Sequence, residues 1–400
     1  MLKGKTVVLG VTGSIAAYKT ASLASSLVKL HADVHVLMTQ NATNFINPIT
    51  FETLTGNKCL VDTFDRNFQF DVTHVSLAKK ADVMLIAPAS ANVIGKIAGG
   101  IADDMLTTTV MASTAPVLIS PAMNTHMYEN PIVQDNLEKL RRFGYKIIAP
   151  AVGMLACRDV GAGKMPEPET LLEWILQEIA CEKDLSGKKI LITAGPTQES
   201  LDPVRYLTNH STGKMGYALA KCAARRGAEV TLIAGPVQLK TQHSRIHRID
   251  VESAREMYEA AQACFPTADV GILCAAVADF RPETVAGQKI KREKEEELTL
   301  HLQATQDIAA SLGKIKEENQ LLVGFALETN NEQQNAEGKL ERKNFDFIVL
   351  NSLNDAGAGF RHDTNKISII DRKGRKDYSL KPKQEVAQDI IDHLAAVLTI

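Results

Sequence analysis

Hydrophobic and polar positions in the first half of the chain predict strands that alternate with helices. Continuous aliphatic and β-branched runs predict strands at Thr6–Gly10, Val34–Met38, Ala81–Pro88 and Tyr145–Ile148. Ala115–Asn124 is predicted to be a further strand that runs into a loop. Apolar side chains at helical spacing predict helices at Ser14–Leu30, Leu137–Phe143 and Glu169–Ile179. Strands that are apolar throughout and separated by helices are typical of a parallel sheet covered on both faces, so an α/β fold is expected.

The pattern restarts after a polar segment at Cys181–Lys189, where we expect a domain boundary. Further strands are predicted at Ile190–Ala194, Val230–Ala234, Val270–Ala275, Leu321–Ala326 and Phe345–Leu350. Helices are predicted at Lys214–Arg226, Ser253–Cys264 and Asn331–Lys343, with a last helix from Gln384. We therefore expect two Rossmann-like domains with mainly parallel sheets, residues 1–183 and 184–400.

Polar and small residues follow the predicted strands of the first half. The third strand leads into APASANVIGKIAGGIADDMLTTT, which we expect to be a Gly-rich loop. The residues of interest after the four strands are Gly13 and Ser14, then Thr39, then Ser90, Asn92 and Asp103, then Asn124. Open α/β sheets bind ligands beyond the carboxyl ends of their strands, so these positions indicate a flat polar ligand with a phosphate. For Gly13 and Ser14 alone, a plain turn between strand and helix is the alternative.

Two further residues carry possible chemistry. His74 begins a helix-like run before a strand, and Cys157 lies in the Gly-rich stretch GMLACRDVGAGKMPEP. A thiol in such a stretch can donate a proton when its pKa is suitable. The alternatives are a structural histidine and a free surface cysteine.

Composition narrows the class of protein. The chain has 45 Lys and Arg against 47 Asp and Glu, a net charge of -2, which gives no sign of nucleic-acid binding. Its six cysteines form no Cys-x-x-Cys pair and no zinc spacing, which favours free thiols in a reducing compartment. No signal peptide and no run of about 18 apolar residues is found, so we expect a cytoplasmic protein without a membrane segment.

Several long motifs coincide with those of a known family. GVTGSIAAYK, THVSLAKKADVMLIAPASANVIGKIAGGIADDML, SPAMNTHMYENP and GMLACRDVGAGKMPEP resemble the flavin-dependent cysteine decarboxylases, in particular the phosphopantothenoylcysteine decarboxylases. TAGPTQESLDPVRYLTNHSTGKMG, AAVADFRP, KIKR and VGFALETNN resemble the phosphopantothenate–cysteine ligases. In this order, over nearly the whole chain, they resemble the bifunctional proteins of coenzyme A biosynthesis.

For the first half, the resemblance implies a flavodoxin-like decarboxylase fold that binds FMN. The cofactor-binding residues by resemblance are Gly13, Ser14, Thr39, Ser90, Asn92 and Asp103. FMN would accept electrons from the substrate thiol, so that CO₂ can leave, and would return them afterwards. By resemblance, Asn124 binds the substrate carboxylate, His74 assists the oxidative decarboxylation across a subunit interface, and Cys157 protonates the enethiolate carbon.

For the second half, the resemblance implies that CTP, with Mg²⁺, activates 4'-phosphopantothenate as an acyl-cytidylate before cysteine attacks. Lys289 would help to form this intermediate and Asn209 would handle it. The CTP-binding residues by resemblance are Ala275, Asp279, Lys289, Asp307, Ile308, Phe325, Lys339 and Lys343. The loop that often reads Lys-Asn-Pro-Asp-Ile in the family reads ATQDI here, so its side-chain contacts are in doubt. Without the resemblance, Lys339 and Lys343 would be interpreted as a solvated helix face.

The sequence also bears on two other classes of function. A flavin-binding regulatory protein could keep the fold without one of the activities, but His74, Asn124 and Cys157 occur together. An NAD(P)-dependent oxidoreductase is disfavoured because neither half has G-x-G-x-x-G with an acidic residue about 20 positions later. The resemblance also implies a homo-oligomer, with a dodecamer as the expected form. The sequence identifies no Mg²⁺ ligands. Lysines that bind a triphosphate do not distinguish the base, so the residues alone do not predict CTP over ATP.

Overall fold

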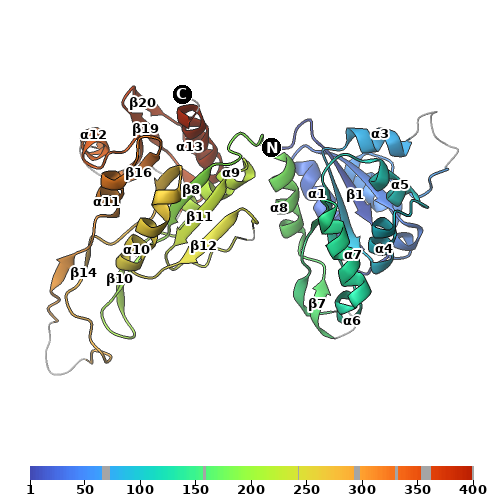
Figure 1. The fold of residues 1–400 in the computed structure, drawn as a ribbon, viewed down its shortest axis with the longest axis horizontal. Helices are drawn as coiled ribbons and strands as arrows, with labels where there is room; N and C mark the ends of the chain where they lie inside the picture. The colour runs from blue at the N-terminus through green and yellow to red at the C-terminus, as the bar shows by residue number, and fades with distance from the viewer. Residues whose placement is uncertain are drawn as a thin grey trace. The chain divides into compact units, whose positions relative to one another are not determined.

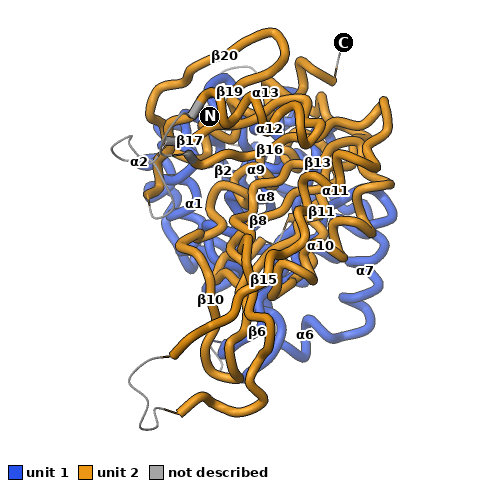
Figure 2. Tube along the Cα trace, turned by 90° about the vertical axis from the view of Figure 1, so that its left-hand side faces the viewer, with its two compact units in different colours: residues 1–181 blue, residues 182–400 orange. Residues whose placement is uncertain are grey.

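The computed structural model describes residues 1–64, 73–155, 159–241, 243–291, 298–328, 332–352 and 362–398. The chain divides into two compact units, Met1–Cys181 and Glu182–Ile400 (Figure 1, Figure 2). Each unit has its own central sheet and its own buried cores on the two faces of that sheet.

The first unit is built on a five-stranded parallel sheet in the order β2-β1-β3-β4-β5. The strands are β1 (Thr6–Val11), β2 (Asp33–Met38), β3 (Val83–Ala89), β4 (Val117–Pro121) and β5 (Lys146–Ile147). The helices are α1 (Ala17–Lys29), α2 (Pro48–Thr55), α3 (Thr73–Lys80), α4 (Ala91–Gly99), α5 (Met105–Ala112), α6 (Thr125–Glu129), α7 (Pro131–Arg142) and α8 (Pro168–Ile179), with a 3₁₀ turn at Gln40–Asn44. A separate antiparallel ribbon joins β6 (Ala151–Met154) to β7 (Val160–Lys164).

The central strand β1 explains why its sequence is apolar without alternation. Val7, Leu9 and Val11 belong to the core that includes α1 and α8, whereas Val8 belongs to the core that includes α4, α5 and α7. Successive side chains of a strand point to opposite faces, so a strand covered on both faces must be apolar at every position.

The segment after β3 corrects the expectation of a loop, because most of it is helical. Ser90 is the N-cap of α4 and accepts a hydrogen bond from the Val93 amide at 3.4 Å. Asp104 caps α5 in a capping box with Thr107. Both caps satisfy N–H groups that the first turn of a helix leaves unpaired, and Val93, Ile94 and Ile97 give α4 its buried face.

The second unit contains an eight-stranded sheet in the order β12-β11-β8-β13-β16-β17-β19-β20. Its strands are β8 (Lys189–Ala194), β11 (Glu229–Ala234), β12 (Ile246–Asp250), β13 (Val270–Leu273), β16 (Leu321–Glu328), β17 (Phe347–Ser352), β19 (Ser368–Asp371) and β20 (Gly374–Asp377). Its helices are α9 (Lys214–Arg225), α10 (Ala254–Cys264), α11 (Ile308–Ile315), α12 (Glu332–Arg342) and α13 (Lys383–Leu398), with a 3₁₀ turn at Phe265–Thr267. Three small ribbons pair β9 (Gln198–Ser200) with β10 (Tyr206–Thr208), β14 (Phe280–Pro282) with β15 (Leu302–Ala304), and β18 (Thr364–Asn365) with β21 (Lys381–Pro382).

Strand order confirms the predicted fold class of two α/β units with mainly parallel sheets. The first sheet has the 2-1-3-4-5 order of doubly wound flavodoxin-like folds. In the large sheet of the second unit, the parallel strands, numbered within that unit, follow the order 3-2-1-4-5-6, and β19 and β20 extend the sheet with antiparallel pairs. The order reverses between β1 and β3 in one unit and between β8 and β13 in the other, so a ligand is expected beyond those strand ends. In the residues that the structure covers, no helix is long and apolar enough to cross a membrane.

Candidate functional sites

The carboxyl ends of the first four strands of the first unit are joined by hydrogen bonds. The Thr39 amide donates to the Val11 carbonyl at 3.0 Å, and the Ala122 amide donates to the Ala89 carbonyl at 3.0 Å. Between β1 and β3, the Thr12 hydroxyl donates to the Pro88 carbonyl at 2.7 Å and accepts from the Ser90 amide at 2.9 Å. These bonds bring Thr39, Ser90 and the turn that carries Gly13 and Ser14 to one edge of the sheet.

Three buried hydroxyls of the first unit lack a hydrogen-bond partner among the residues described. They belong to Thr39 after β2, Ser120 in β4 and Thr125 at the start of α6. A buried polar group without a partner costs about 1–3 kcal/mol, so such groups usually mark a ligand or an ordered water. The sequence did not identify Ser120 and Thr125, because a single hydroxyl residue is not part of any recognisable motif.

Gly13, two residues after the end of β1, lies close to the segment after β2. A Cβ atom on Gly13 would lie 2.9 Å from Cβ of Asn41, which real side chains do not tolerate. The hydroxyl of the next residue, Ser14, accepts a hydrogen bond from the Ala16 amide at 3.3 Å, just before α1 begins. Free amides at the start of a helix are suited to a phosphate group.

The other residues predicted around this ligand lie on helices and loops. Asn92 is exposed in the first turn of α4. Asp103 is exposed and pairs with Lys96 at 2.7 Å, and this hydrogen bond holds the pKa of the Asp103 carboxyl below its usual value. His74 is the second residue of α3 and is half-buried, so the predicted helical run there is confirmed.

Asn124 links the loop after β4 to the ribbon of β6 and β7. Its carboxamide donates to the Asp159 carboxylate at 2.8 Å, and its oxygen accepts from the His126 amide at 2.9 Å. The ribbon rests on this loop so closely that a Cβ on Gly163 would lie 2.3 Å from the Met123 carbonyl oxygen. Cys157, between β6 and β7, lies outside the described residues.

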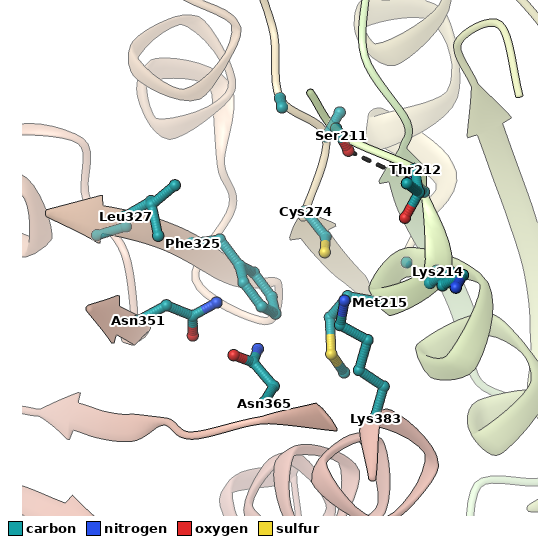
Figure 3. Close-up of a pocket in the computed structure, with 15 residues that line it drawn as sticks. Ser211, Thr212, Lys214, Met215, Cys274, Phe325, Leu327, Asn351, Asn365 and Lys383 are labelled. Atoms are coloured by element: carbon teal, nitrogen blue, oxygen red, sulfur yellow. Dashed lines mark hydrogen bonds between the residues drawn. The ribbon is translucent and has the colours of Figure 1, made fainter. Parts of the chain in front are cut away.

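The second unit has a pocket at the carboxyl ends of β13, β16 and β17 (Figure 3). Two residues predicted to bind a nucleotide, Ala275 and Phe325, line it. Figure 3 shows the Phe325 ring and the carboxamides of Asn351 and Asn365 facing the same space. Within the described part of the chain, the buried Oδ1 of Asn351 has no hydrogen-bond partner. The remaining lining includes Ser211, Thr212 and Lys214 at the start of α9, and Lys383 at the start of α13.

Two titratable side chains, Lys383 and Cys274, line this pocket. The Lys383 ammonium is buried and donates to the His362 carbonyl at 2.6 Å. Burial lowers the pKa of this lysine, and the nearby Lys214 charge acts in the same direction. Burial also raises the pKa of the Cys274 thiol to about 12, so it remains protonated at neutral pH. Sequence reasoning missed Asn351, Asn365 and Lys383 because they lie far along the chain from the recognised motifs.

Asn209 joins the segment after β13 to the segment that leads into α9. Its carboxamide nitrogen donates to the Ala276 carbonyl, and its oxygen accepts from the Ser211 amide at 3.1 Å. Ala276 lines the pocket, and its amide donates to the Gly195 carbonyl at 2.9 Å. Asn209 therefore lies directly beside the pocket that Ala275 and Phe325 line.

The other predicted nucleotide residues form a second group at the start of α11 and the end of α12. Asp307 is the N-cap of α11 and lies 2.9 Å from the Lys343 ammonium. Burial alone would raise the Asp307 pKa, but the Ala310 amide and Lys343 lower it overall. The Lys343 amide donates to the Lys339 carbonyl at 3.0 Å, so the two lysines are one helical turn apart. The Ile308 side chain is buried in the core, which leaves only its backbone for a ligand.

Asp279 and Lys289 complete the predicted set. The exposed Asp279 follows the pocket segment, and its carbonyl accepts from the Thr305 amide at 2.9 Å, which connects the ATQDI loop to it. Lys289 is exposed on the chain between β14 and β15. Among the described residues, the predicted ligase residues therefore lie in three places: at or beside the pocket, at α11 and the end of α12, and, for Lys289, between β14 and β15.

The same residues bear on whether the protein holds Mg²⁺. The described ranges contain no group of three or more His, Cys, Asp or Glu side chains that could hold a metal ion. Mg²⁺ in nucleotide enzymes keeps several waters and is bound largely by substrate phosphates. In the described ranges, the protein alone therefore supplies no such Mg²⁺ site.

Comparison with known proteins gives matches in both units. Residues 1–180 match the family Flavoprotein, and residues 185–398 match the DNA/pantothenate metabolism flavoprotein C-terminal domain. The coenzyme A biosynthesis bifunctional protein CoaBC of Bacillus subtilis is 46% identical over 99% of this chain and 98% of that protein. The protein of the same name from Vibrio cholerae is 44% identical over 98% of each. A cysteine/cysteine sulfinic acid decarboxylase from an unknown prokaryotic organism is 50% identical over 86% of this chain and 98% of that protein.

Proposed function

The chain belongs to the family of bifunctional coenzyme A biosynthesis proteins, and from this premise we propose how its residues divide the chemistry. The enzyme ligates 4'-phosphopantothenate with cysteine and decarboxylates phosphopantothenoylcysteine to 4'-phosphopantetheine. We assign the decarboxylase to residues 1–183 and the ligase to residues 184–400. The assignment rests on one observation: the two family matches fall in succession on two compact units.

FMN is the proposed cofactor of the first unit. The buried Thr39 hydroxyl has no partner among the described residues, and the backbone approaches closely at Gly13; both observations fit a bound group with a terminal phosphate. Gly13, Ser14 and Thr39 would hold that phosphate, and Ser90, Asn92 and Asp103 would surround the ring system. When bound, FMN supplies a reversible electron acceptor, which simple loss of CO₂ from a cysteine amide lacks.

This chain's own residues then bind the substrate and move its proton. Asn124 donates to the substrate carboxylate, a role that fits its 2.8 Å bond to the Asp159 carboxylate. Once the substrate sulfur is oxidised, the C–C bond to the carboxylate breaks and its electron pair remains in an enethiolate. His74 assists the oxidation, and Cys157 gives its thiol proton to the enethiolate carbon as the product is reduced.

Replacement of the proton donor tests this half. The Cys157→Ser variant is expected to release CO₂ but to accumulate an oxidised enethiol product in place of 4'-phosphopantetheine. Product analysis by mass spectrometry distinguishes the two thiols. A normal yield of 4'-phosphopantetheine from this variant contradicts the assignment of Cys157.

The second unit activates a carboxylate with CTP. A carboxylate oxygen of 4'-phosphopantothenate attacks the α-phosphate, and the bond to pyrophosphate breaks; the cysteine amine then displaces CMP from the acyl carbon. Lys289 stabilises the negative charge that develops in the first step, and Asn209 orients the acyl-cytidylate. Ala275 and Phe325 in the pocket, Asp279 beside it, and Asp307, Ile308, Lys339 and Lys343 at α11 and α12 contact the nucleotide.

Two assays of the purified full chain test the overall proposal. The protein is expected to be yellow from FMN and to release pyrophosphate only when 4'-phosphopantothenate and a nucleotide are both present. CTP is expected to support turnover better than ATP. A flavin-binding protein without activity would be yellow but inactive. Decarboxylation of free cysteine in preference to phosphopantothenoylcysteine would instead indicate the activity named for the 50% identical relative.

Cellular location and assembly follow the same premise. The described cysteines Cys59, Cys181, Cys222, Cys264 and Cys274 are free thiols, which supports a reducing compartment, and we propose the cytoplasm. We also propose a homo-oligomer, a dodecamer by resemblance, without nucleic-acid or membrane partners. Light scattering during size-exclusion chromatography measures its mass.

A further inference from the structure

Asp202 is a carboxylate buried in the turn between β9 and β10, where only 2% of the residue is exposed. It accepts hydrogen bonds from the backbone amides of Val204 at 2.7 Å and Arg205 at 2.8 Å, within its own turn. Its second oxygen accepts from the Ile290 amide at 3.1 Å, across 88 residues of sequence. Aspartate is rarely buried so fully unless its charge has a specific partner.

The peptide of Ile290 is held on both sides by this turn. While Asp202 accepts from its N–H, the Arg205 guanidinium donates to its carbonyl oxygen. The same guanidinium lies 3.2 Å from the Asp202 carboxylate. A further bond runs from the Ala286 amide to the Leu201 carbonyl at 3.0 Å. The segment from Ala286 to Ile290 is therefore docked on the turn at several points.

Asp202 remains ionised at neutral pH in this arrangement. Burial alone would raise its pKa, but the amides of Val204, Ile290 and Arg205 and the Arg205 charge together lower it below the usual value. Lys289 directly precedes the docked peptide and is exposed, so its location depends on its backbone and not on side-chain packing.

We propose that Asp202 is a positioning residue of the ligase, which fixes the Lys289 ammonium where the acyl-nucleotide forms. This inference rests on the role proposed above for Lys289. A carboxylate suits the task because it is an acceptor only, and it can take three amides and a guanidinium at once. An asparagine of the same size would direct an N–H₂ group against one of these donors.

The test is a double-mutant cycle on the full chain, with pyrophosphate release as the readout. Asp202→Asn is expected to slow this step about 10- to 100-fold, mostly in kcat, because a displacement of about 1 Å can cost about 100-fold. In the Lys289→Ala background, the same substitution is expected to cause little further loss. An equal factor in both backgrounds overturns the proposal, because it would show that Asp202 acts independently of Lys289.

Two more measurements separate positioning from folding. Decarboxylation of phosphopantothenoylcysteine by the same preparations is expected to be unchanged, since Asp202 belongs to the other unit. Ile290→Pro removes the N–H that donates to Asp202 and leaves the bonds within the Asp202 turn. It is expected to slow pyrophosphate release like Asp202→Asn, and full activity overturns the proposal. If Lys289→Ala alone retains the full rate, the function proposed for Lys289 is wrong. That result differs from equal effects of Asp202→Asn in the two backgrounds, which would contradict only the role of Asp202.

Discussion

Replacement of Gly235 by alanine should disturb the ligase unit and leave the decarboxylase unit unaffected. Gly235 directly follows β11 and passes close to the loop after β8. A Cβ built on it would lie 1.8 Å from the Pro196 carbonyl oxygen and 2.9 Å from the Pro196 carbonyl carbon. Gly235 is not among the residues with positive φ, so the cost is steric and not conformational.

The magnitude follows from this distance. A carbon and an oxygen in contact lie about 3.3 Å apart, so the Pro196 carbonyl must move by about 1.5 Å, the difference between about 3.3 Å and the 1.8 Å found here. The neighbouring bonds from Ala276 to Gly195 at 2.9 Å and from Thr197 to Ala276 at 3.3 Å do not survive such a shift. We expect about 1–3 kcal/mol less stability, as for other overpacked sites, and pyrophosphate release slowed about 100-fold, as for a displaced active-site group.

Thermal unfolding and the two activity assays measure the effect on one preparation. For a unit of this size, about 1–3 kcal/mol corresponds to a midpoint lower by about 2–12 °C. Gly338→Ala is the matched control, because nothing lies within 4 Å of the Cβ added at this position in α12. Alanine there should be neutral or stabilising by up to about 1 kcal/mol. If Gly235→Ala unfolds within about 1 °C of the parent and keeps its ligase rate, the close approach does not constrain the loop.

Three further predictions concern single side chains. Thr39→Val removes a buried hydroxyl that has no partner among the described residues; it should weaken flavin binding by about 1 kcal/mol, about fivefold in Kd, and unchanged flavin absorbance per chain after dialysis would contradict this. Asp33 has its pKa lowered to about 2, because hydrogen bonds from Lys80 and Asn57 outweigh the opposing effect of burial. The stabilisation by ionised Asp33 is therefore complete above pH 3.8 and is lost as the pH falls toward 2. Because 38% of the side chain is exposed, this stabilisation amounts to about 1 kcal/mol after screening. Asp33→Asn should remove that much of the acid dependence of the free energy of unfolding. Asp307→Ala should lower the free energy of unfolding by about 1 kcal/mol, because α11 loses its N-cap. Lys343→Met removes only the ion-pair partner of Asp307 and should lower it less. Equal losses in urea unfolding would mean that the ion pair, and not the cap, provides the stability.

Local patterns predicted most elements because their physical causes are local. The strands expected at Thr6–Gly10 and Ile190–Ala194 are confirmed with one residue more at an end, since buried aliphatic runs favour strands in any context. The segment that forms α4 and α5 was wrongly expected to be a loop, because its many small residues obscured the caps at Ser90 and Asp104. The short antiparallel strands β19 and β20 were missed, since they depend on pairing with β17.

The sequence by itself determined two successive α/β units and the turn residues that follow their strands, such as Gly13 and Thr39. Only the tertiary structure decided the strand orders 2-1-3-4-5 and 3-2-1-4-5-6, and with them the edges at which distant residues meet. It brought Asn351 and Lys383 into the pocket of Phe325 and set Asp202 against the peptide of Ile290. The reason is physical: hydrophobic periodicity records which face of an element is buried, whereas strand pairing and contacts between remote segments depend on how a whole unit packs.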